Sequence, residues 1–280
     1  MRAFDFPALA ESLLPVVLAA GQAQMRYYQC GVAVETKPDS SPVTVADRES
    51  EALLLEGLWN AARGVPVIAE ESMALGAAPA KSRSFFLVDP LDGTREYVNR
   101  VGEFTVNVGL VVDSAPVFGM IYAPALGDLY VTLGEGRAVE AHVPLDEPNA
   151  TLSSLPLRDL RTRQPNPESL TVLESRSHRT AETEAFLTGY TIGEVKRSGS
   201  SLKFCRIARG DADFYVRLGP TREWDTAAGQ AILEAAGGSV TDLSGKRLSY
   251  GKAEGGYGNP HFVAWGRDPI AARTKAISDR

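Results

Sequence analysis

An acidic corner follows an apolar run in the first third of the chain. The residues Asp89-Pro90-Leu91-Asp92-Gly93-Thr94 come directly after Phe85-Phe86-Leu87-Val88, which is typical of a buried strand. Hard cations such as Mg²⁺ take oxygen ligands, so Asp89, Asp92 and the Leu91 carbonyl are candidate metal ligands. Taken alone, the motif is equally compatible with an acidic turn that caps a helix.

The residues after this corner can begin a helix at Thr94. Gly93 permits the turn that such a start requires, because it has no Cβ atom. The free N–H groups and the dipole at a helix N-terminus favour an anion, so phosphate oxygens could bind here. The chemistry indicated is phosphate transfer beside a divalent cation.

Two further acids strengthen this interpretation. Glu70 ends the short apolar run Val67-Ile68-Ala69, and Asp225 stands at the start of an apolar helix pattern. Singly, Glu70 could be a solvated loop acid and Asp225 a helix cap. Together with the acidic corner they would form a cluster whose mutual repulsion requires cations.

Basic residues are concentrated in the second half of a chain whose formal net charge is −6. Seven of them and three acids lie between Glu194 and Arg222, which favours a small anionic ligand, whereas the overall charge argues against general nucleic-acid binding. Lys203 and Arg217 could bind a phosphate with the N–H groups near Ser200, although each could also be an ordinary surface residue.

The elements that must position these residues follow from periodicity. Helices are predicted over 5–29, 47–62, 180–188, 200–209 and 224–236, and strands over 65–68, 84–88, 104–112, 116–122, 128–133, 170–173, 191–195, 213–216 and 239–241. Residues 37–42 are predicted to form a loop, and 141–168 an irregular connection. The fold predicted is an α+β lobe over 1–140 followed by an α/β lobe over 141–280, with the active site between them.

Composition excludes other classes of protein. No apolar run approaches the ~18 residues that span a bilayer, and Ala8–Ala20 is interrupted by Glu11 and Pro15, so it is interpreted as a first helix rather than a signal segment. Cys30 and Cys205 lack metal-ligand spacing and are interpreted as reduced, buried thiols of a cytoplasmic protein.

Four motifs carry a resemblance to a known family. Val45-Ala46-Asp47, Ala69-Glu70-Glu71-Ser72, Asp89 to Thr94 and Trp224 to Gly229 occur in the order and spacing of the Mg²⁺-dependent, lithium-sensitive inositol monophosphatase superfamily. The resemblance implies a layered αβαβα sandwich and two or three Mg²⁺ per site. It implies metal ligation by Glu70, Asp89, the Leu91 carbonyl, Asp92 and Asp225, with the attacking water oriented by Asp47 and Thr94.

Two segments resemble one branch of this superfamily, the bacterial 3′(2′),5′-bisphosphate nucleotidases. They are Gly102 to Asn107 and Ser200 to Cys205. The implied reaction is hydrolysis of 3′-phosphoadenosine 5′-phosphate to AMP and phosphate. The implied substrate-binding residues are Gly93, Thr94, His178, Ser200, Lys203, Arg217 and Asp225.

Two alternatives remain open at this stage. One is an inositol or broad sugar phosphatase of the same fold, although inositol-phosphate members usually carry a glutamate where this chain has Arg217. The other is a non-catalytic nucleotide sensor. We expect a monomer or homodimer without a transmembrane segment. The expected location is the cytoplasm, and a peripheral position at the cytoplasmic face of the inner membrane stays open.

Overall fold

Two β-sheets form the frame of the molecule. The computed structural model describes residues 4–30, 34–36, 42–77, 79–147, 149–176 and 180–267. The seven-stranded sheet has the order β3-β4-β5-β6-β7-β8-β9, with β3 and β4 parallel and the other neighbours antiparallel. Its strands are Val67–Ala69, Ser84–Asp92, Thr105–Val112, Ala115–Ala123, Asp128–Gly134, Arg137–His142 and Arg158–Asp159.

The second sheet has five strands in the order β11-β10-β12-β14-β13, and it is mixed. β10 pairs in parallel with β11 and β12, whereas β14 runs antiparallel to both of its neighbours. The strands are β10 (Leu170–Ser175), β11 (Ile192–Ser198), β12 (Phe214–Arg217), β13 (Ser239–Asp242) and β14 (Phe262–Trp265). A small hairpin, β1 (Val34–Thr36) with β2 (Pro42–Thr44), stands apart from both sheets.

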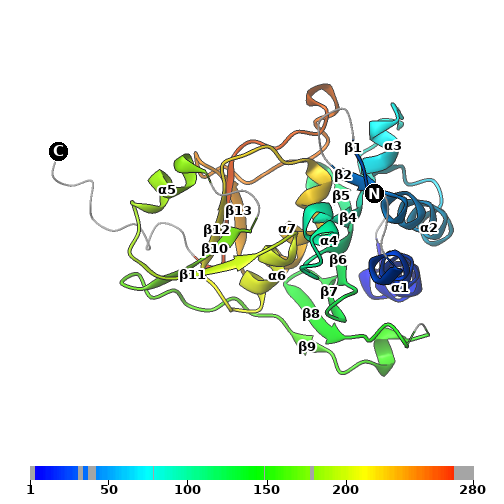
Figure 1. The fold of residues 1–280 in the computed structure, drawn as a ribbon, viewed down its shortest axis with the longest axis horizontal. Helices are drawn as coiled ribbons and strands as arrows, with labels where there is room; N and C mark the ends of the chain where they lie inside the picture. The colour runs from blue at the N-terminus through cyan, green and yellow to red at the C-terminus, as the bar shows by residue number, and fades with distance from the viewer. Residues whose placement is uncertain are drawn as a thin grey trace.

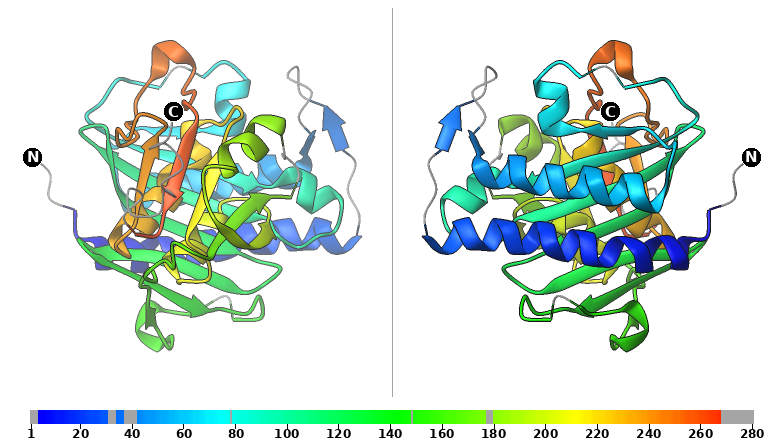
Figure 2. Two further views of the ribbon diagram at one scale, coloured as in Figure 1. Left: turned by 90° about the vertical axis from the view of Figure 1, so that its left-hand side faces the viewer. Right: turned by 90° about the vertical axis from the view of Figure 1, so that its right-hand side faces the viewer.

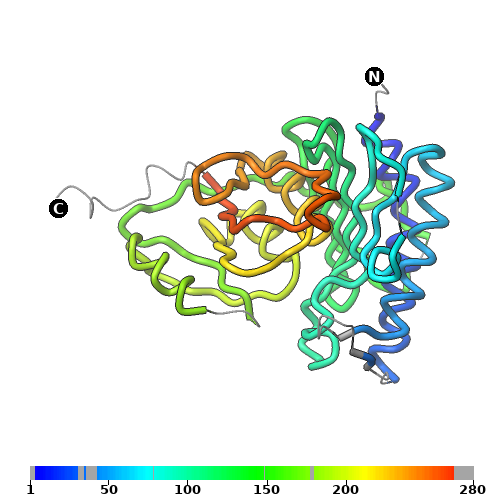
Figure 3. Tube along the Cα trace, turned by 90° about the horizontal axis from the view of Figure 1, so that it is seen from above, coloured from blue at the N-terminus to red at the C-terminus, as the bar shows by residue number. Residues whose placement is uncertain are grey.

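Helices complete a five-layer sandwich (Figures 1 and 3). The long helices α1 (Phe6–Cys30) and α2 (Val45–Ala61) run side by side over the outer face of the seven-stranded sheet, as Figure 2 shows. Helices α6 (Leu202–Ala208) and α7 (Ala227–Ala235) lie between the sheets, and α5 (Ala181–Leu187) covers the outer face of the second. The predicted αβαβα arrangement is confirmed.

Short helical segments join these layers. They are α3 (Glu70–Ala74), α4 (Thr94–Val98), and the 3₁₀ turns Leu152–Ser154, Glu223–Asp225 and Ala253–Gly255. Three of them contain residues that carry the predicted chemistry: α3 begins with Glu70, α4 begins with Thr94, and the turn at Glu223–Asp225 ends with Asp225.

Close contact between α7 and the first sheet joins the two halves. A Cβ atom on Gly119 of β6 would lie 2.2 Å from the Ala228 carbonyl oxygen, so only glycine lets the helix approach this far. The largest buried apolar cluster occupies the same layer and includes Leu87, Phe204 and Ile232. The site between the halves is therefore built on a rigid core.

Helix α1 is, within the described residues, the helix that is long and apolar enough to cross a membrane, with a mean hydropathy of 1.3 over 18 of its residues. Half of that window is buried, and Leu13, Leu14 and Val17 have no exposed surface. A core helix passes the same test of length and composition, so this is weak evidence for a membrane span.

Several expectations from the sequence need correction. Strands β8, β9 and β14 were not predicted, and Cys30 is exposed, whereas Cys205 is buried; both thiols are free. Cys30 is exposed because it is the last residue of α1, beyond the part of the helix that packs on the sheet. The lobe boundary near residue 140 stays a prediction, although the first sheet continues to Asp159. Most of the predicted loop 37–42 lies outside the described residues.

Candidate active site

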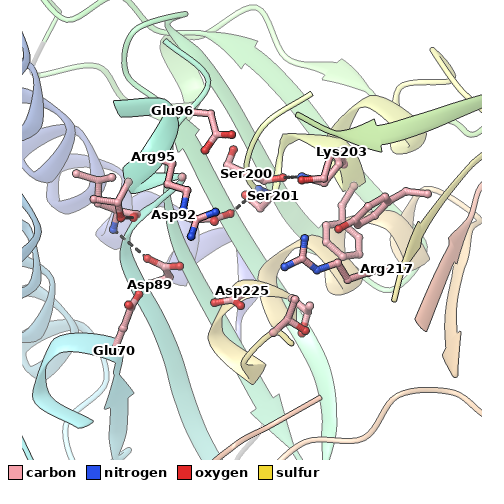
Figure 4. A pocket seen from close by; sticks show the side chains of 18 of the residues that line it. Glu70, Asp89, Asp92, Arg95, Glu96, Ser200, Ser201, Lys203, Arg217 and Asp225 are labelled. Atoms are coloured by element: carbon pink, nitrogen blue, oxygen red, sulfur yellow. Dashed lines mark hydrogen bonds between the residues drawn. The ribbon is translucent and has the colours of Figure 1, made fainter. Parts of the chain in front are cut away.

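One pocket collects the predicted site residues from both halves of the chain. Its volume is about 240 Å³. Figure 4 shows Glu70, Asp89 and Asp92 on one side of it, with Arg95 beside Asp92, and Lys203 and Arg217 on the other side. The predicted site residues that line this pocket are Glu70, Asp89, Leu91, Asp92, Gly93, Thr94, Ser200, Lys203, Arg217 and Asp225. The motifs that are far apart in the sequence therefore meet in space.

The four acids come from three separate elements. Glu70 begins α3 at the end of β3, Asp89 and Asp92 lie in β4, and Asp225 ends a 3₁₀ turn. The parallel pairing of β3 and β4 brings their carboxyl ends to the same edge of the sheet. A bulge between Asp89 and Asp92 turns the second carboxylate toward the pocket.

Backbone N–H groups hold these carboxylates in place. Asp89 Oδ1 accepts from the Leu91 N–H at 3.0 Å, and Asp225 Oδ2 accepts from the Arg222 N–H at 2.8 Å. Asp92 Oδ2 accepts from the Ser201 N–H, which belongs to the second half of the chain. Three of the four predicted acidic ligands are therefore oriented by backbone groups of the fold itself.

Negative charge in this pocket is unfavourable in the absence of cations. Burial raises the pKa of Asp92 despite the nearby Lys203 ammonium, and burial followed by repulsion from Asp92 and Glu70 raises the pKa of Asp225. A cation placed between the carboxylates would relieve both effects.

The donor set fits a hard divalent cation. All four acid side chains and the Leu91 carbonyl present oxygen, the atom that Mg²⁺ prefers. Within the described residues, however, no three side chains of the His, Cys, Asp or Glu type are grouped closely enough to surround one ion. The pocket thus has the right ligand chemistry, and the side chains would have to close on the ion.

Asp47 and Thr94 form a pair at the edge of the acidic group. The Thr94 hydroxyl lies 3.5 Å from Asp47 Oδ1 and 3.3 Å from the Leu91 carbonyl oxygen. Asp47 is buried, and its Oδ2 accepts from the N–H and the hydroxyl of Thr44 at 2.8 and 2.7 Å. The capping box that starts α2 therefore fixes the carboxylate behind Thr94.

Two cations face the acids. Lys203 Nζ donates to the Ser200 carbonyl at 2.6 Å and lies 5.0 Å from the centre of the Tyr215 ring. Burial lowers the pKa of Lys203 to about 8, with Asp92 opposing this shift and Arg217 adding to it. Arg217 ends β12 and donates to the Pro220 carbonyl, while its buried Nε has no hydrogen-bond partner among the described residues.

Sequence reasoning missed several side chains in this pocket. His178 lies outside the described residues, and Asp47 does not line the pocket, although it contacts Thr94. Residues that line it without having been predicted include Arg95, Glu96, Ser175, Tyr215, Thr221 and Phe262. The sequence could have indicated Arg95, because this residue follows Thr94 directly. In the structure the Arg95 side chain lies beside Asp92 (Figure 4). Glu96 lies in the same short helix, α4, whereas Ser175, Tyr215 and Phe262 reach the pocket through the packing of β10, β12 and β14.

Comparison with known proteins agrees with this geometry. The chain is 38% identical over 256 residues to the 3′(2′),5′-bisphosphate nucleotidase CysQ of Salmonella typhimurium. The aligned region covers 91% of this chain and 98% of that protein. The CysQ of Escherichia coli K12 is also 38% identical, over 87% of this chain and 94% of that protein.

Solved structures give the same result. The crystal structure of CysQ from Bacteroides thetaiotaomicron, described as a bacterial member of the inositol monophosphatase family, superposes with a TM-score of 0.76 at 33% identity over 92% of this chain and 97% of that one. The sequence profile of the inositol monophosphatase family matches residues 9–275. The order of the motifs, the five-layer fold and these matches together show that the chain belongs to the inositol monophosphatase family.

Proposed function

We propose that this chain is a Mg²⁺-dependent 3′(2′),5′-bisphosphate nucleotidase that hydrolyses the 3′-phosphate of 3′-phosphoadenosine 5′-phosphate to give AMP and phosphate. The observation that carries the proposal is a pocket lined by the four acids predicted as metal ligands, Glu70, Asp89, Asp92 and Asp225, together with Lys203 and Arg217. An acidic side suits divalent cations, and a basic side suits a second phosphate. The nucleotidases named above, at 38% identity, support the same reaction.

The acids would hold the metal, and the pair beside them would direct water. When bound, Mg²⁺ supplies positive charge that neutralises the phosphate oxygens and lowers the pKa of water. Glu70, Asp89, Asp92, Asp225 and the Leu91 carbonyl would be its ligands. The Thr94 hydroxyl, backed by Asp47, would orient the attacking water in line with the departing 3′-oxygen. No serine, cysteine or histidine nucleophile is required.

The basic side would distinguish a nucleotide from a simple monoester. Of the three N–H donors of Lys203, two have backbone partners at 2.6 and 3.4 Å among the described residues, which leaves one for a phosphate oxygen. The Arg217 guanidinium offers a forked set of donors. Because 240 Å³ is below the ~300–1,000 Å³ of pockets that enclose a drug-sized ligand, the adenine would extend through the mouth.

Relative turnover of phosphate esters tests the proposal. With saturating Mg²⁺, we expect kcat/KM for 3′-phosphoadenosine 5′-phosphate to exceed that for inositol 1-phosphate by at least about 10-fold, the value of one charge-assisted hydrogen bond of ~1.5 kcal/mol. Phosphate release from a panel that also contains 3′-AMP and a sugar phosphate measures this ratio. Equal or faster turnover of the inositol ester would overturn the nucleotide assignment and favour the broader phosphatase.

Arg217→Gln isolates the contribution of the second phosphate. The change removes the charge and the fork, so KM for the bisphosphorylated nucleotide should rise about 10- to 100-fold, as expected for a lost hydrogen bond to a charged group worth ~1.5–3 kcal/mol. KM for inositol 1-phosphate should change less than about 3-fold. Arg137→Gln is the matched control, because Arg137 forms an exposed ion pair with Asp159 outside the pocket. A parallel rise for both substrates would contradict the role given to Arg217.

Other parts of the assignment stay predictions. We propose two or three Mg²⁺ per site, a monomer or homodimer, and a cytoplasmic location that could include the face of the inner membrane. The substrate-binding role of His178 also stays a prediction, because this residue lies outside the described part of the chain.

A further inference from the structure

Glu103 is a buried carboxylate that joins the two halves beside the pocket without lining it. Glu103 lies just before β5 in the first half of the chain, and 8% of the surface of the whole residue is exposed. Its Oε2 accepts from the Gly199 N–H at 2.8 Å and from Arg176 Nε at 3.0 Å, and its Oε1 accepts from Arg206 Nη2 at 3.0 Å. One side chain thus binds three groups that all belong to the second half.

The charge state of Glu103 suits this arrangement. Burial alone raises its pKa, but the hydrogen bonds from Arg176 and Gly199 and the charge of Arg206 more than offset this, so the pKa of Glu103 lies below its ordinary value. The carboxylate is therefore ionised at neutral pH and accepts from all three donors.

The loop that Glu103 contacts forms one wall of the pocket. Ser200 has a φ of +48°, a left-handed conformation that costs a non-glycine residue roughly 1 kcal/mol and persists only where neighbours impose it. The Ser200 carbonyl accepts from Lys203 Nζ, and both residues line the pocket. The position of Lys203 is therefore coupled to the conformation of this loop.

Other contacts hold the far end of the loop. The Ser201 hydroxyl donates to Asn107 Oδ1 at 2.7 Å and lies 2.9 Å from the Thr105 hydroxyl, and the Ser201 N–H donates to Asp92. The near end, at Gly199, is held by Glu103. A Cβ atom on Gly199 would lie 2.8 Å from the Glu103 carbonyl oxygen, which shows how closely the two segments approach.

We infer that Glu103 is a positioning residue for substrate recognition: it fixes the loop of residues 199–201 so that Ser200 and Lys203 face the acids across the pocket. Glu103 does not act on the reacting atoms. Asp89, Asp225 and Thr94, which carry the proposed chemistry, are held by other contacts. Asp92 is bound by the Ser201 N–H, but Ser201 is itself held by Asn107 and Thr105 at the end of the loop that Glu103 does not contact. Loss of Glu103 should therefore weaken substrate binding more than it slows the chemical step. The inference rests on the proposed function for its choice of substrate.

Glu103→Gln tests the inference. Glutamine keeps one acceptor oxygen but loses the second and the charge, so at least one of the three donors is left without its partner. For the bisphosphorylated nucleotide we expect KM to rise about 10-fold or more, with kcat within about 3-fold of the wild-type value. A loss confined to kcat, or no change in KM, would overturn the inference.

Glu140→Gln is a matched control. The Glu140 side chain is 12% exposed, close to the 11% of Glu103, and it likewise pairs with two arginines, Arg158 and Arg209, but it lies outside the pocket. Its substitution should lower thermal stability to a similar extent and leave KM unchanged. If both variants raised KM equally, the effect would be one of general stability and the inference would fail.

Amide hydrogen exchange separates this inference from the proposed function. In Glu103→Gln, exchange at residues 199–201 should be at least about 10-fold faster than in Glu140→Gln, whatever the enzyme hydrolyses. Equal exchange in the two variants would overturn the inference even if the nucleotide is the substrate. Should Glu103→Gln fail to fold, Arg176→Gln removes only one of the three contacts and should give a smaller change in the same direction.

Discussion

The substitution Asp92→Asn should lower the rate of phosphate release from 3′-phosphoadenosine 5′-phosphate by at least about 10³-fold, while the protein remains folded. Asp92 is one of four carboxylates proposed to hold Mg²⁺ and lies at the centre of the pocket (Figure 4). A metal stabilises the transition state by several kcal/mol, and a loss of ~4 kcal/mol corresponds to about 10³-fold in rate. Steady-state phosphate release at high Mg²⁺ measures the loss.

The fold should survive because asparagine can keep the hydrogen bond that the Asp92 side chain accepts from Ser201. Its amide oxygen can accept from the Ser201 N–H as Asp92 Oδ2 does, and a buried charge is removed. We expect the melting temperature in chelator to stay within a few degrees of the wild-type value, since changes without a cavity or an unpaired buried group are small. Removal of Mg²⁺ from the wild-type protein with a chelator should lower the rate of phosphate release by at least as much as Asp92→Asn does.

Asp113→Asn makes the same chemical change outside the pocket. Asp113 forms an exposed ion pair with Arg83, and its φ of +50° is one that asparagine tolerates. This control should retain full activity. Turnover by Asp92→Asn within about 10-fold of the wild-type rate would show that the acids do not hold a catalytic metal, and the phosphatase mechanism would then have to be abandoned.

Much of the fold could be predicted because its elements carry clear periodic patterns. The helices Phe6–Cys30 and Val45–Ala61 and the strand Thr105–Val112 differ from prediction by no more than two residues at either end. Strand β14, Phe262–Trp265, was missed because it is buried at every position, and a four-residue apolar run has no periodicity to read. Its place between β12 and β13 depends on long-range packing that no local pattern encodes.

The residues of the candidate site were likewise predictable only where a sequence pattern indicates them. Asp89, Asp92 and Thr94 were found because they are close in sequence, and Glu70 and Asp225 because each acid ends or begins an apolar run. The resemblance to a family then supplied the relation between these distant motifs and the role of each residue. The role of Glu103 could not be predicted, since its three partners come from the end of β10, a loop and α6. Tertiary contacts of this kind appear only when the two halves are packed together.

Thr94→Val should lower kcat by about 10²- to 10⁴-fold, the range that a positioned proton-accepting or proton-donating group contributes. Valine keeps the shape of threonine but loses the hydroxyl that lies 3.5 Å from Asp47 Oδ1. Because the hydroxyl is proposed to orient water only, KM should change little. Thr94→Ser, which retains the hydroxyl, should recover most of the activity. A Val variant within about 10-fold of wild type would exclude Thr94 from the reaction.

Combining this change with Asp47→Asn tests whether the two residues act as one unit. Asp47 Oδ1 meets the Thr94 hydroxyl at the edge of the pocket, and Asp47 Oδ2 accepts from Thr44 at the start of α2. If Asp47 acts by orienting the Thr94 hydroxyl, the double variant should lose no more kcat than the more damaging single variant, because groups that act together have non-additive effects. Asp47→Asn also weakens the capping box of α2, so the melting temperature of the variant is measured beside kcat. Fully additive losses would mean that Asp47 contributes to kcat independently of the Thr94 hydroxyl.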